Sequence, residues 1–312
     1  MDPRIVFALE RTGATSATAL AAAGLSRREI ERAVSAGVLR RLRRNALVDG
    51  ERWRTSPPWE RHGMRASAVA AGLTTDAACP VVLTHHSALA IHGISLHGVD
   101  DRVHLSWADG RRGRTSALVR VHRLVPERFL GVAAGLPVVS VAAACVQVAA
   151  AFGPEAALVS VDDALHRERM TVHDLEESVA GVGAGRTSSA PRQVLDLADP
   201  KAESAAESRA RWCFHLAGLP PATPQVKLRD EYGEVWARLD FLIEEAGVVI
   251  EVDGMGKYRD IADLRAEKLR EDRLRDLGYE VVRLTWADLS DPRVVRRKVG
   301  AALDRARRRR TA

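Results

Sequence analysis

Residues 236–258 read W-A-R-L-D-F-L-I-E-E-A-G-V-V-I-E-V-D-G-M-G-K-Y, and this stretch determines the fold of the C-terminal third of the chain. Side chains alternate along residues 235–243 and again along residues 248–253, which predicts two strands. The E-E-A-G between them has the length of a hairpin turn. Strand alternation then places Glu251 and Asp253 on the same face.

If the two strands pair as a hairpin, Asp240 lies near Glu251, and three carboxylates converge at one edge of an apolar sheet. Buried charge is costly without a partner, and a divalent metal is one such partner. Mg²⁺ binds one or two carboxylates together with water and phosphate oxygens. The ion would lower the pKa of a bound water, and Lys257, four residues after Asp253, is placed to hold that water or to help deprotonate it. The alternative is a surface hairpin with a turn at Asp253-Gly254 and solvated acids.

The motif D-F-x9-E-V-D-G-x-x-K-Y, followed by E-K-x-R-E-x-x-L-R-x-L-G-Y-E-V-V-R-L-T, resembles domain-of-unknown-function family 559. That family is related to very-short-patch-repair endonucleases and the PD-(D/E)xK nuclease fold. The resemblance implies an α-β-β-β-α-β core, metal-dependent phosphodiester hydrolysis, and Asp240 and Glu251 as metal ligands. In this chain Asp253 stands at the usual lysine position, and Lys257 sits where relatives often have His or Lys.

A helix expected at residues 203–217 supplies a further candidate. In the nucleases that the chain resembles, a glutamate from this helix can join the metal site, and Glu207 is the residue that we assign to this role. The alternative is that acids in the first turn simply stabilise the helix N-terminus.

The helix expected at residues 263–277 carries arginine on its inward side. Ala266, Leu269 and Leu277 share one sector, and Arg270 and Arg273 fall in that same sector. An inward arginine needs a carboxylate or a phosphate. These two arginines are therefore expected either to brace the acid cluster or to reach substrate phosphates.

The first 55 residues predict a winged helix-turn-helix. Helices are expected at residues 4–11 and 15–23, a third begins at the capping box Ser26-x-x-Glu29, and residues 38–48 form a short hairpin. The third helix and the wing carry seven arginines against two acids, a net charge of +5; the arginines are Arg27, Arg28, Arg32, Arg40, Arg41, Arg43 and Arg44. Such a surface suits DNA, with the helix in the major groove and the wing on phosphates. The alternatives are a solvated basic helix or a module for protein contacts.

The pattern L-S-R-R-E-I-E-R-A-V-S-A-G-V-L-R-R-L-R-R-N-A-L-V, residues 25–48, resembles the N-terminal domain of AbiEi-type antitoxins of abortive-infection toxin–antitoxin systems. The stretch T-H-H-S-A-L-A-I-H-G, residues 84–93, resembles the middle part of AbiEi-like proteins, where a helix packs on the winged domain. The resemblance implies DNA binding and leaves a toxin partner open.

The middle of the chain, residues 56–200, is expected to be a mixed α/β domain that ends in a linker. Strands are expected at residues 101–107 and 117–124, and the glycine-rich run 181–189 is the best linker. His85 and His92 are seven residues apart and could share a helix face, but no acid or cysteine joins them. We therefore favour a structural helix over a metal site there.

Composition and charge limit the possibilities further. The 312 residues carry a net charge of +6, which permits nucleic-acid binding, and the three cysteines match no zinc or disulfide spacing, which fits a reduced cytoplasm. The N-terminus is not a signal peptide. Residues 129–154 hold no charged side chain, and we interpret them as a strand at 136–139 and a buried helix at 141–152, not as a membrane span. Residues 293–310 have a net charge of +8, and 307–310 are expected to be mobile.

The sequence thus predicts a cytoplasmic α/β multidomain protein with no membrane segment. Its parts are a winged helix-turn-helix (1–55), a mixed α/β middle region with a linker (56–200) and a restriction-endonuclease-like domain (201–312). We expect a DNA-binding protein with a Mg²⁺-dependent endonuclease-like domain that serves repair or defence. The alternative is an antitoxin-like transcriptional regulator with a degenerate nuclease fold. A third interpretation, a partner-binding protein, requires neither DNA nor metal.

Overall fold

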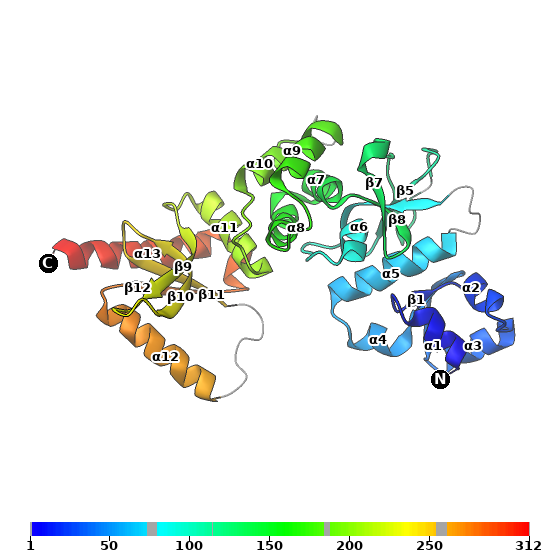
Figure 1. The fold of residues 1–312 in the computed structure, drawn as a ribbon, viewed down its shortest axis with the longest axis horizontal. Helices are drawn as coiled ribbons and strands as arrows, with labels where there is room; N and C mark the ends of the chain where they lie inside the picture. The colour runs from blue at the N-terminus through cyan, green and yellow to red at the C-terminus, as the bar shows by residue number, and fades with distance from the viewer. Residues whose placement is uncertain (1, 74–79, 114, 184–187, 254–260, 312) are drawn as a thin grey trace. The chain divides into compact units, whose positions relative to one another are not determined.

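The computed structural model describes residues 2–73, 80–113, 115–183, 188–253 and 261–311, with the backbone alone at 261–267 and 311 (Figure 1). It divides into two compact units, Met1–Ala198 and Asp199–Ala312. Both units combine helices with a sheet, so the chain is a mixed α/β protein, as the sequence predicts. No described helix has both the length and the apolar character that a membrane crossing requires.

The chain begins with three short helices and a small sheet. These are α1 (Pro3–Leu9), α2 (Ala17–Ala22), α3 (Arg27–Ser35) and the strands β1 (Ala14–Thr15), β2 (Leu39–Arg43) and β3 (Ala46–Asp49). The strands pair antiparallel in the order β1-β3-β2. Leucine and isoleucine side chains from the helices and strands form one buried core. Helix α3 begins with the predicted capping box of Ser26 and Glu29.

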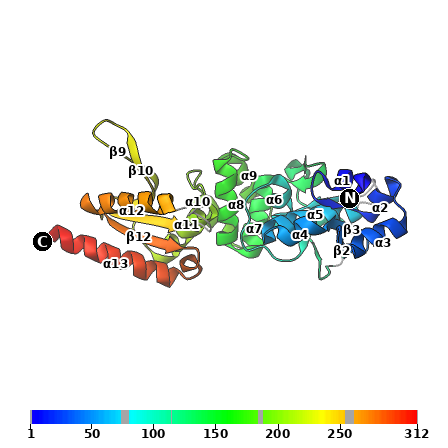
Figure 2. The ribbon, with the colours of Figure 1, turned by 90° about the horizontal axis from the view of Figure 1, so that it is seen from below.

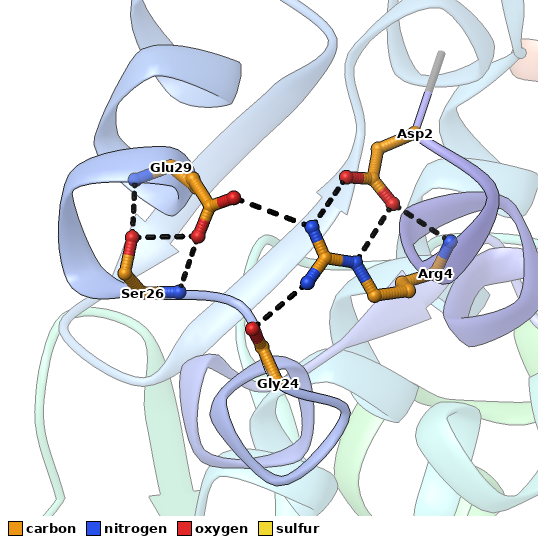
Figure 3. A network of polar contacts seen from close by, with 5 residues as sticks. All are labelled: Asp2, Arg4, Gly24, Ser26 and Glu29. Carbon is orange, nitrogen blue, oxygen red and sulfur yellow. Dashed lines mark hydrogen bonds and ion pairs between the residues drawn. The ribbon is translucent and has the colours of Figure 1, made fainter.

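Arg4 joins α1 to the start of α3 (Figure 3). Its Nη2 lies 2.7 Å from Asp2 Oδ2 and 3.3 Å from Glu29 Oε1, and its Nη1 donates to the carbonyl of Gly24 at 2.8 Å. Glu29 also accepts hydrogen bonds from the backbone and hydroxyl of Ser26. One carboxylate therefore caps α3 and anchors α1 to it.

The boundary expected at residue 55 lies inside the first unit. Helices α4 (Gly50–Thr55) and α5 (Pro58–Leu73) follow β3, and α5 packs against β1 and β3. Asn45, in the turn between β2 and β3, accepts from the backbone of Thr18 at 3.0 Å and donates to the carbonyl of Gly72 at 3.0 Å. A Cβ on Gly72 would lie 2.4 Å from the Asn45 carbonyl oxygen, so only glycine permits this approach.

The middle of the first unit is a five-stranded mixed sheet in the order β6-β5-β4-β8-β7. Its strands are β4 (Val81–Leu83), β5 (Val103–Trp107), β6 (Val119–Val121), β7 (Leu130–Ala133) and β8 (Leu136–Val139). The pairs β4/β8 and β5/β6 are parallel, and β4/β5 and β7/β8 are antiparallel. A short 3-10 helix, η1 (Glu127–Phe129), precedes β7. The strand predicted at 136–139 is confirmed.

Helices make up the rest of the first unit. They are α6 (His85–His92), α7 (Val141–Phe152), α8 (Pro154–His166), α9 (Val172–Gly181) and α10 (Ala190–Leu197). Helix α7 is the buried helix predicted at 141–152, and it contacts each of the other four. Because α10 packs against α7, α8 and α9, the glycine-rich run 181–189 is not the linker between units. The division falls after α10, at Ala198.

Over residues 205–285 the second unit has the element order that the sequence predicts, and two helices that were not predicted follow. Its elements are α11 (Ala205–Ala217), β9 (Thr223–Arg229), β10 (Val235–Ile243), β11 (Val248–Asp253), α12 (Ile261–Asp276), β12 (Glu280–Thr285), a short 3-10 helix η3 (Asp288–Ser290) and α13 (Pro292–Thr311). The sheet order is β12-β11-β10-β9, with β11 and β12 parallel and the other pairs antiparallel. The bounds of β10 and β11 are those predicted from alternation.

Helices cover both faces of this sheet (Figure 2). Helices α11 and α13 share one core with Phe241, Ile250 and Leu284, whereas Leu274 of α12 packs with Leu242 and Val249. The predicted inward face of α12 is therefore wrong in part. Leu269 and Leu277 are 70% and 59% exposed, and Leu274, 1% exposed, makes the core contact instead.

The basic C-terminal segment is helical and does not form the mobile tail that we expected. Helix α13 runs to Thr311. Arg305 and Arg309 hold it to β12, because both pair with the buried carboxylate of Glu280, at 2.9 and 3.0 Å. Arg310 donates to the carbonyl of Glu245 in the turn after β10.

Candidate functional site

A row of polar residues crosses the sheet of the second unit. Phe241 pairs with Ile250, so the next position along brings Asp240 beside Glu251. The neighbouring pairs on β9 place Gln225 opposite Asp240, and Glu251 pairs with Arg283 on β12. The polar row is therefore Gln225, Asp240, Glu251 and Arg283. The expected proximity of Asp240 and Glu251 follows from this register.

Asp240 lies where the ladder between β10 and β11 ends. Its Oδ2 accepts a hydrogen bond from the backbone N–H of Val252 at 2.8 Å. Backbone pairing of the two strands runs only over the three pairs from Phe241/Ile250 to Ile243/Val248. The carboxylate thus takes the place of a main-chain acceptor, and it is held against β11 at a fixed position.

Glu251 is a buried carboxylate, 6% exposed, and Arg270 of α12 pairs with it. Nη2 lies 3.1 Å from Oε2 and Nη1 lies 3.4 Å from Oε1, and Nη1 also donates to the carbonyl of Arg238 at 3.1 Å. The charge-assisted pair compensates the cost of burying the carboxylate. Arg270 therefore braces the acid cluster, one of the two roles expected for it.

Arg273, the other arginine expected to face inward, meets an aromatic ring. Its guanidinium carbon lies 4.0 Å from the centroid of the Trp236 ring, a cation–π distance. The sequence did not predict this ring contact, and the expected role of Arg273 toward the acid cluster or substrate phosphates stays a prediction.

Glu207 caps α11 and reaches the polar row through Gln225. Its carboxylate accepts from the backbone of Glu203 at 3.1 Å, from the hydroxyl of Ser204 at 2.8 Å and from Nε2 of Gln225 at 2.8 Å. Gln225 has φ +55°, a left-handed conformation that is unfavourable for a side chain other than glycine. Such outliers cluster at functional sites, where surrounding contacts enforce them.

Two further residues, Asp253 and Lys257, were expected to belong to the acid site. Asp253, at the end of β11, is half-buried and pairs in register with Thr285. Lys257 lies outside the described residues. Among the residues that the structure describes, Asp240, Glu251 and Asp253 are not close enough together to hold one ion as a set of three. Asp240 and Glu251 remain as the adjacent pair, and Mg²⁺ is typically bound by one or two carboxylates.

Six of the seven predicted DNA-binding arginines are exposed. They lie on α3, on β2 and in the turn after it, and they are Arg27, Arg28, Arg32, Arg40, Arg43 and Arg44. Ile30 faces the core, so Arg28 and Arg32, each two positions from Ile30 along α3, face away from it. Arg41 is half-buried and differs, because it pairs with Glu31 at 2.8 Å and donates to the carbonyl of Arg44.

A second cluster, missed by the sequence analysis, lies in the first unit. His85, His104 and His122 each offer a ring nitrogen, and these three nitrogens lie within 4.8 Å of one another. His92, the predicted neighbour of His85, instead bonds the carbonyl of Val139 at 2.9 Å. One sequence signal could have indicated this cluster, because His104 and His122 fall within the two strands predicted at 101–107 and 117–124. In the structure these strands are β5 and β6, which pair with each other, and His122 directly follows β6.

Comparisons with known proteins identify relatives but no activity. No protein-family model matches the sequence. Uncharacterized protein MT2308 and uncharacterized protein Rv2248, from two Mycobacterium tuberculosis strains (CDC 1551 / Oshkosh and ATCC 25618 / H37Rv), are each 31% identical to the chain over 199 residues. The match covers 64% of this chain and 73% of each relative. The chain belongs to their family.

Proposed function

We propose that the chain is a DNA-binding protein whose second unit carries a metal-dependent, endonuclease-like acid site. The observation that carries this proposal is the placement of Asp240 and Glu251 side by side on β10 and β11. Two further features support it. Gln225, opposite Asp240 in register, has a left-handed backbone and bonds Glu207, and α3 and β2 present a group of exposed arginines.

The residues of the row fit a divalent cation bound with phosphate. Mg²⁺ held there would lower the pKa of a bound water and neutralise charge on a scissile phosphodiester. Asp240 supplies one carboxylate, and the hydrogen bond from the Val252 N–H holds it against β11. Glu251 supplies the second carboxylate. Arg270 holds Glu251 in place and adds positive charge beside the phosphate position.

Cleavage assays test the acid site directly. Supercoiled, linear and mismatched DNA are incubated with Mg²⁺ or Mn²⁺ and with the wild type, Asp240→Asn or Glu251→Gln. Asn keeps an acceptor for the Val252 N–H and removes only the charge. Glu244→Gln is the matched control, because Glu244 is an exposed acid at the other end of β10. We expect both site variants to lose cleavage and the control to retain it.

If the Asp240→Asn/Glu251→Gln double variant cleaves DNA at the rate of the wild type, the nuclease proposal is wrong. The observation that favours the second candidate, a non-catalytic regulator, is that Arg270 already spans both oxygens of Glu251, as a salt bridge in a fold remnant would. Asp253, which stands where the resembling nucleases have their lysine, also favours the non-catalytic regulator. A regulator would bind DNA in EDTA without cutting it, and removing the charges on α3 would abolish that binding.

A further inference from the structure

Three imidazoles converge at one end of the five-stranded sheet in the first unit. His85 opens α6 directly after β4, His104 lies in β5, and His122 follows β6. The rings of His85 and His122 are stacked with centroids 3.9 Å apart, and Nδ1 of His104 lies 2.9 Å from Nε2 of His122. Adjacent strands and the following helix start thus bring together residues that are far apart in sequence.

Other side chains fix the orientation of two of these rings. Asp100 Oδ1 lies 2.9 Å from Nε2 of His104, so the carboxylate holds the proton on Nε2 and leaves the Nδ1 lone pair toward His122. Thr84 Oγ1 lies 3.0 Å from Nδ1 of His85, which leaves Nε2 of that ring for a ligand. Histidines that bind metals are typically oriented in this way, by a carboxylate or another polar group on the second nitrogen.

The backbone of His85 is strained. Its φ is +51°, in the left-handed region, at the junction between β4 and α6. Gln147 of α7 holds this conformation, because its Oε1 accepts from the His85 N–H at 3.1 Å. A strained, side-chain-supported position of this kind suggests a constraint imposed by function.

A groove of about 1120 Å³ gives access to the cluster. His85 and His122 both line it, together with Arg120, Arg123 and Arg192. Among the described residues that line the groove there is no aspartate or glutamate. An ion at the cluster would therefore face a cationic surface, which suits an anionic fourth ligand.

We propose that His85, His104 and His122 bind one divalent transition-metal ion, such as Zn²⁺, with an open coordination position toward the arginine-lined groove. Three imidazole nitrogens favour Zn²⁺, Cu²⁺, Ni²⁺ or Co²⁺ over Mg²⁺ or Ca²⁺. Three protein ligands with a fourth position open to water is the arrangement of catalytic zinc sites. This centre is separate from the acid row of the second unit, and it stands or falls independently of it.

The competing arrangement is a metal-free chain of hydrogen bonds from Asp100 through His104 to His122. The distance of 2.9 Å between His104 Nδ1 and His122 Nε2 fits a hydrogen bond. Bonds of about 2.1 Å to a tetrahedral ion would separate these nitrogens by roughly 3.4 Å. Metal binding therefore requires the two rings to move apart by a few tenths of an ångström.

The test uses the full chain without a histidine tag, stripped with EDTA, dialysed and titrated with Zn²⁺ or Co²⁺ at pH 7.5. Calorimetry should report one ion per chain, and Co²⁺ should give the intense visible bands of four-coordinate cobalt. We expect His104→Ala and His122→Asn to lose the cobalt spectrum. Asp100→Asn should weaken metal binding by roughly 10- to 100-fold, because the Asp100 carboxylate orients His104 and is not itself a metal ligand.

His173→Ala is the matched control, because His173 is an exposed histidine on α9. It should bind as the wild type does. Circular dichroism establishes that each variant is folded, and His122→Asn, at a half-buried strand end, serves where His104→Ala does not fold. The proposal is overturned if the folded wild type gives no four-coordinate cobalt spectrum, or if folded His122→Asn binds as tightly as His173→Ala.

Discussion

Arg270 of α12 places its guanidinium across the carboxylate of Glu251 in β11, with Nη2 3.1 Å from Oε2 and Nη1 3.4 Å from Oε1. The glutamate side chain is 8% exposed and the arginine side chain 22% exposed. This pair joins α12 to the face of the sheet that carries Glu251, and it places a positive charge beside the acid row.

Arg270→Met should destabilise the protein, because it leaves the Glu251 charge buried without its arginine. Breaking a fully buried ion pair costs about 3–5 kcal/mol, and partial exposure of Arg270 reduces the expected loss to about 2 kcal/mol. The free energy of unfolding is measured by urea denaturation, with circular dichroism as the signal. The double variant Arg270→Met/Glu251→Met should recover most of the loss. Equal stability of the wild type and Arg270→Met would show that the pair contributes little.

The face that α12 presents to the sheet can be tested with three leucines. Leu274→Ala removes a side chain that is 1% exposed and should cost about 2–4 kcal/mol. Leu269→Ala and Leu277→Ala remove side chains that are 70% and 59% exposed and should change stability by about 0.5 kcal/mol or less. Thermal melting of the three variants gives the ranking. A cost for Leu269→Ala similar to that for Leu274→Ala would contradict this orientation of α12.

These leucines mark the limit of what the sequence could predict. Strands β10 and β11 were predictable because alternation and a short turn are local, and the hairpin register then placed Asp240 beside Glu251. Helix α12 is rich in charge, so its sequence does not show which sector meets the sheet. Arg270 faces the sheet as the sequence predicts, whereas the core contacts of the folded unit select Leu274 over Leu269 and Leu277.

The histidine cluster could be predicted only in part, for a different reason. His85, His104 and His122 meet only because β5 pairs antiparallel with β4 and parallel with β6. A parallel pair has no hairpin turn between its strands, so no local signal reports its register. Spacing along a single helix suggested His92 as the companion of His85, and the fold directs His92 to a backbone carbonyl instead.

The contact between α1 and α3 should depend on pH in the acid range. Hydrogen bonds from Arg4 lower the pKa of Asp2 from 3.8 to about 2, and hydrogen bonds from Ser26, with a further one from Arg4, lower the pKa of Glu29 (Figure 3). A carboxyl whose pKa is lower in the folded state stabilises the fold above its unfolded pKa. That contribution is lost as the pH falls through the folded pKa.

Arg4→Met isolates this contribution. The variant should melt below the wild type at pH 6, and the difference in melting temperature should shrink as the pH falls from about 4 to about 2. Arg167→Met, which removes an exposed arginine that pairs with Asp163, controls for the loss of one positive charge. A difference between Arg4→Met and the wild type that stays constant down to pH 2 would show that Asp2 and Glu29 do not act through Arg4.

The proposed DNA-binding surface makes a quantitative prediction for salt dependence. Each phosphate contact releases condensed counterions, so the logarithm of the binding constant falls with the logarithm of salt by about 0.9 per contact. Arg28→Gln/Arg32→Gln removes two exposed charges from α3 and should reduce that slope by about 2 in fluorescence anisotropy with duplex DNA in EDTA. Arg167→Gln/Arg169→Gln removes the same charge from another part of the first unit and should leave the slope near that of the wild type. An equal effect of both pairs would mean that net charge, and not the α3 surface, attracts DNA.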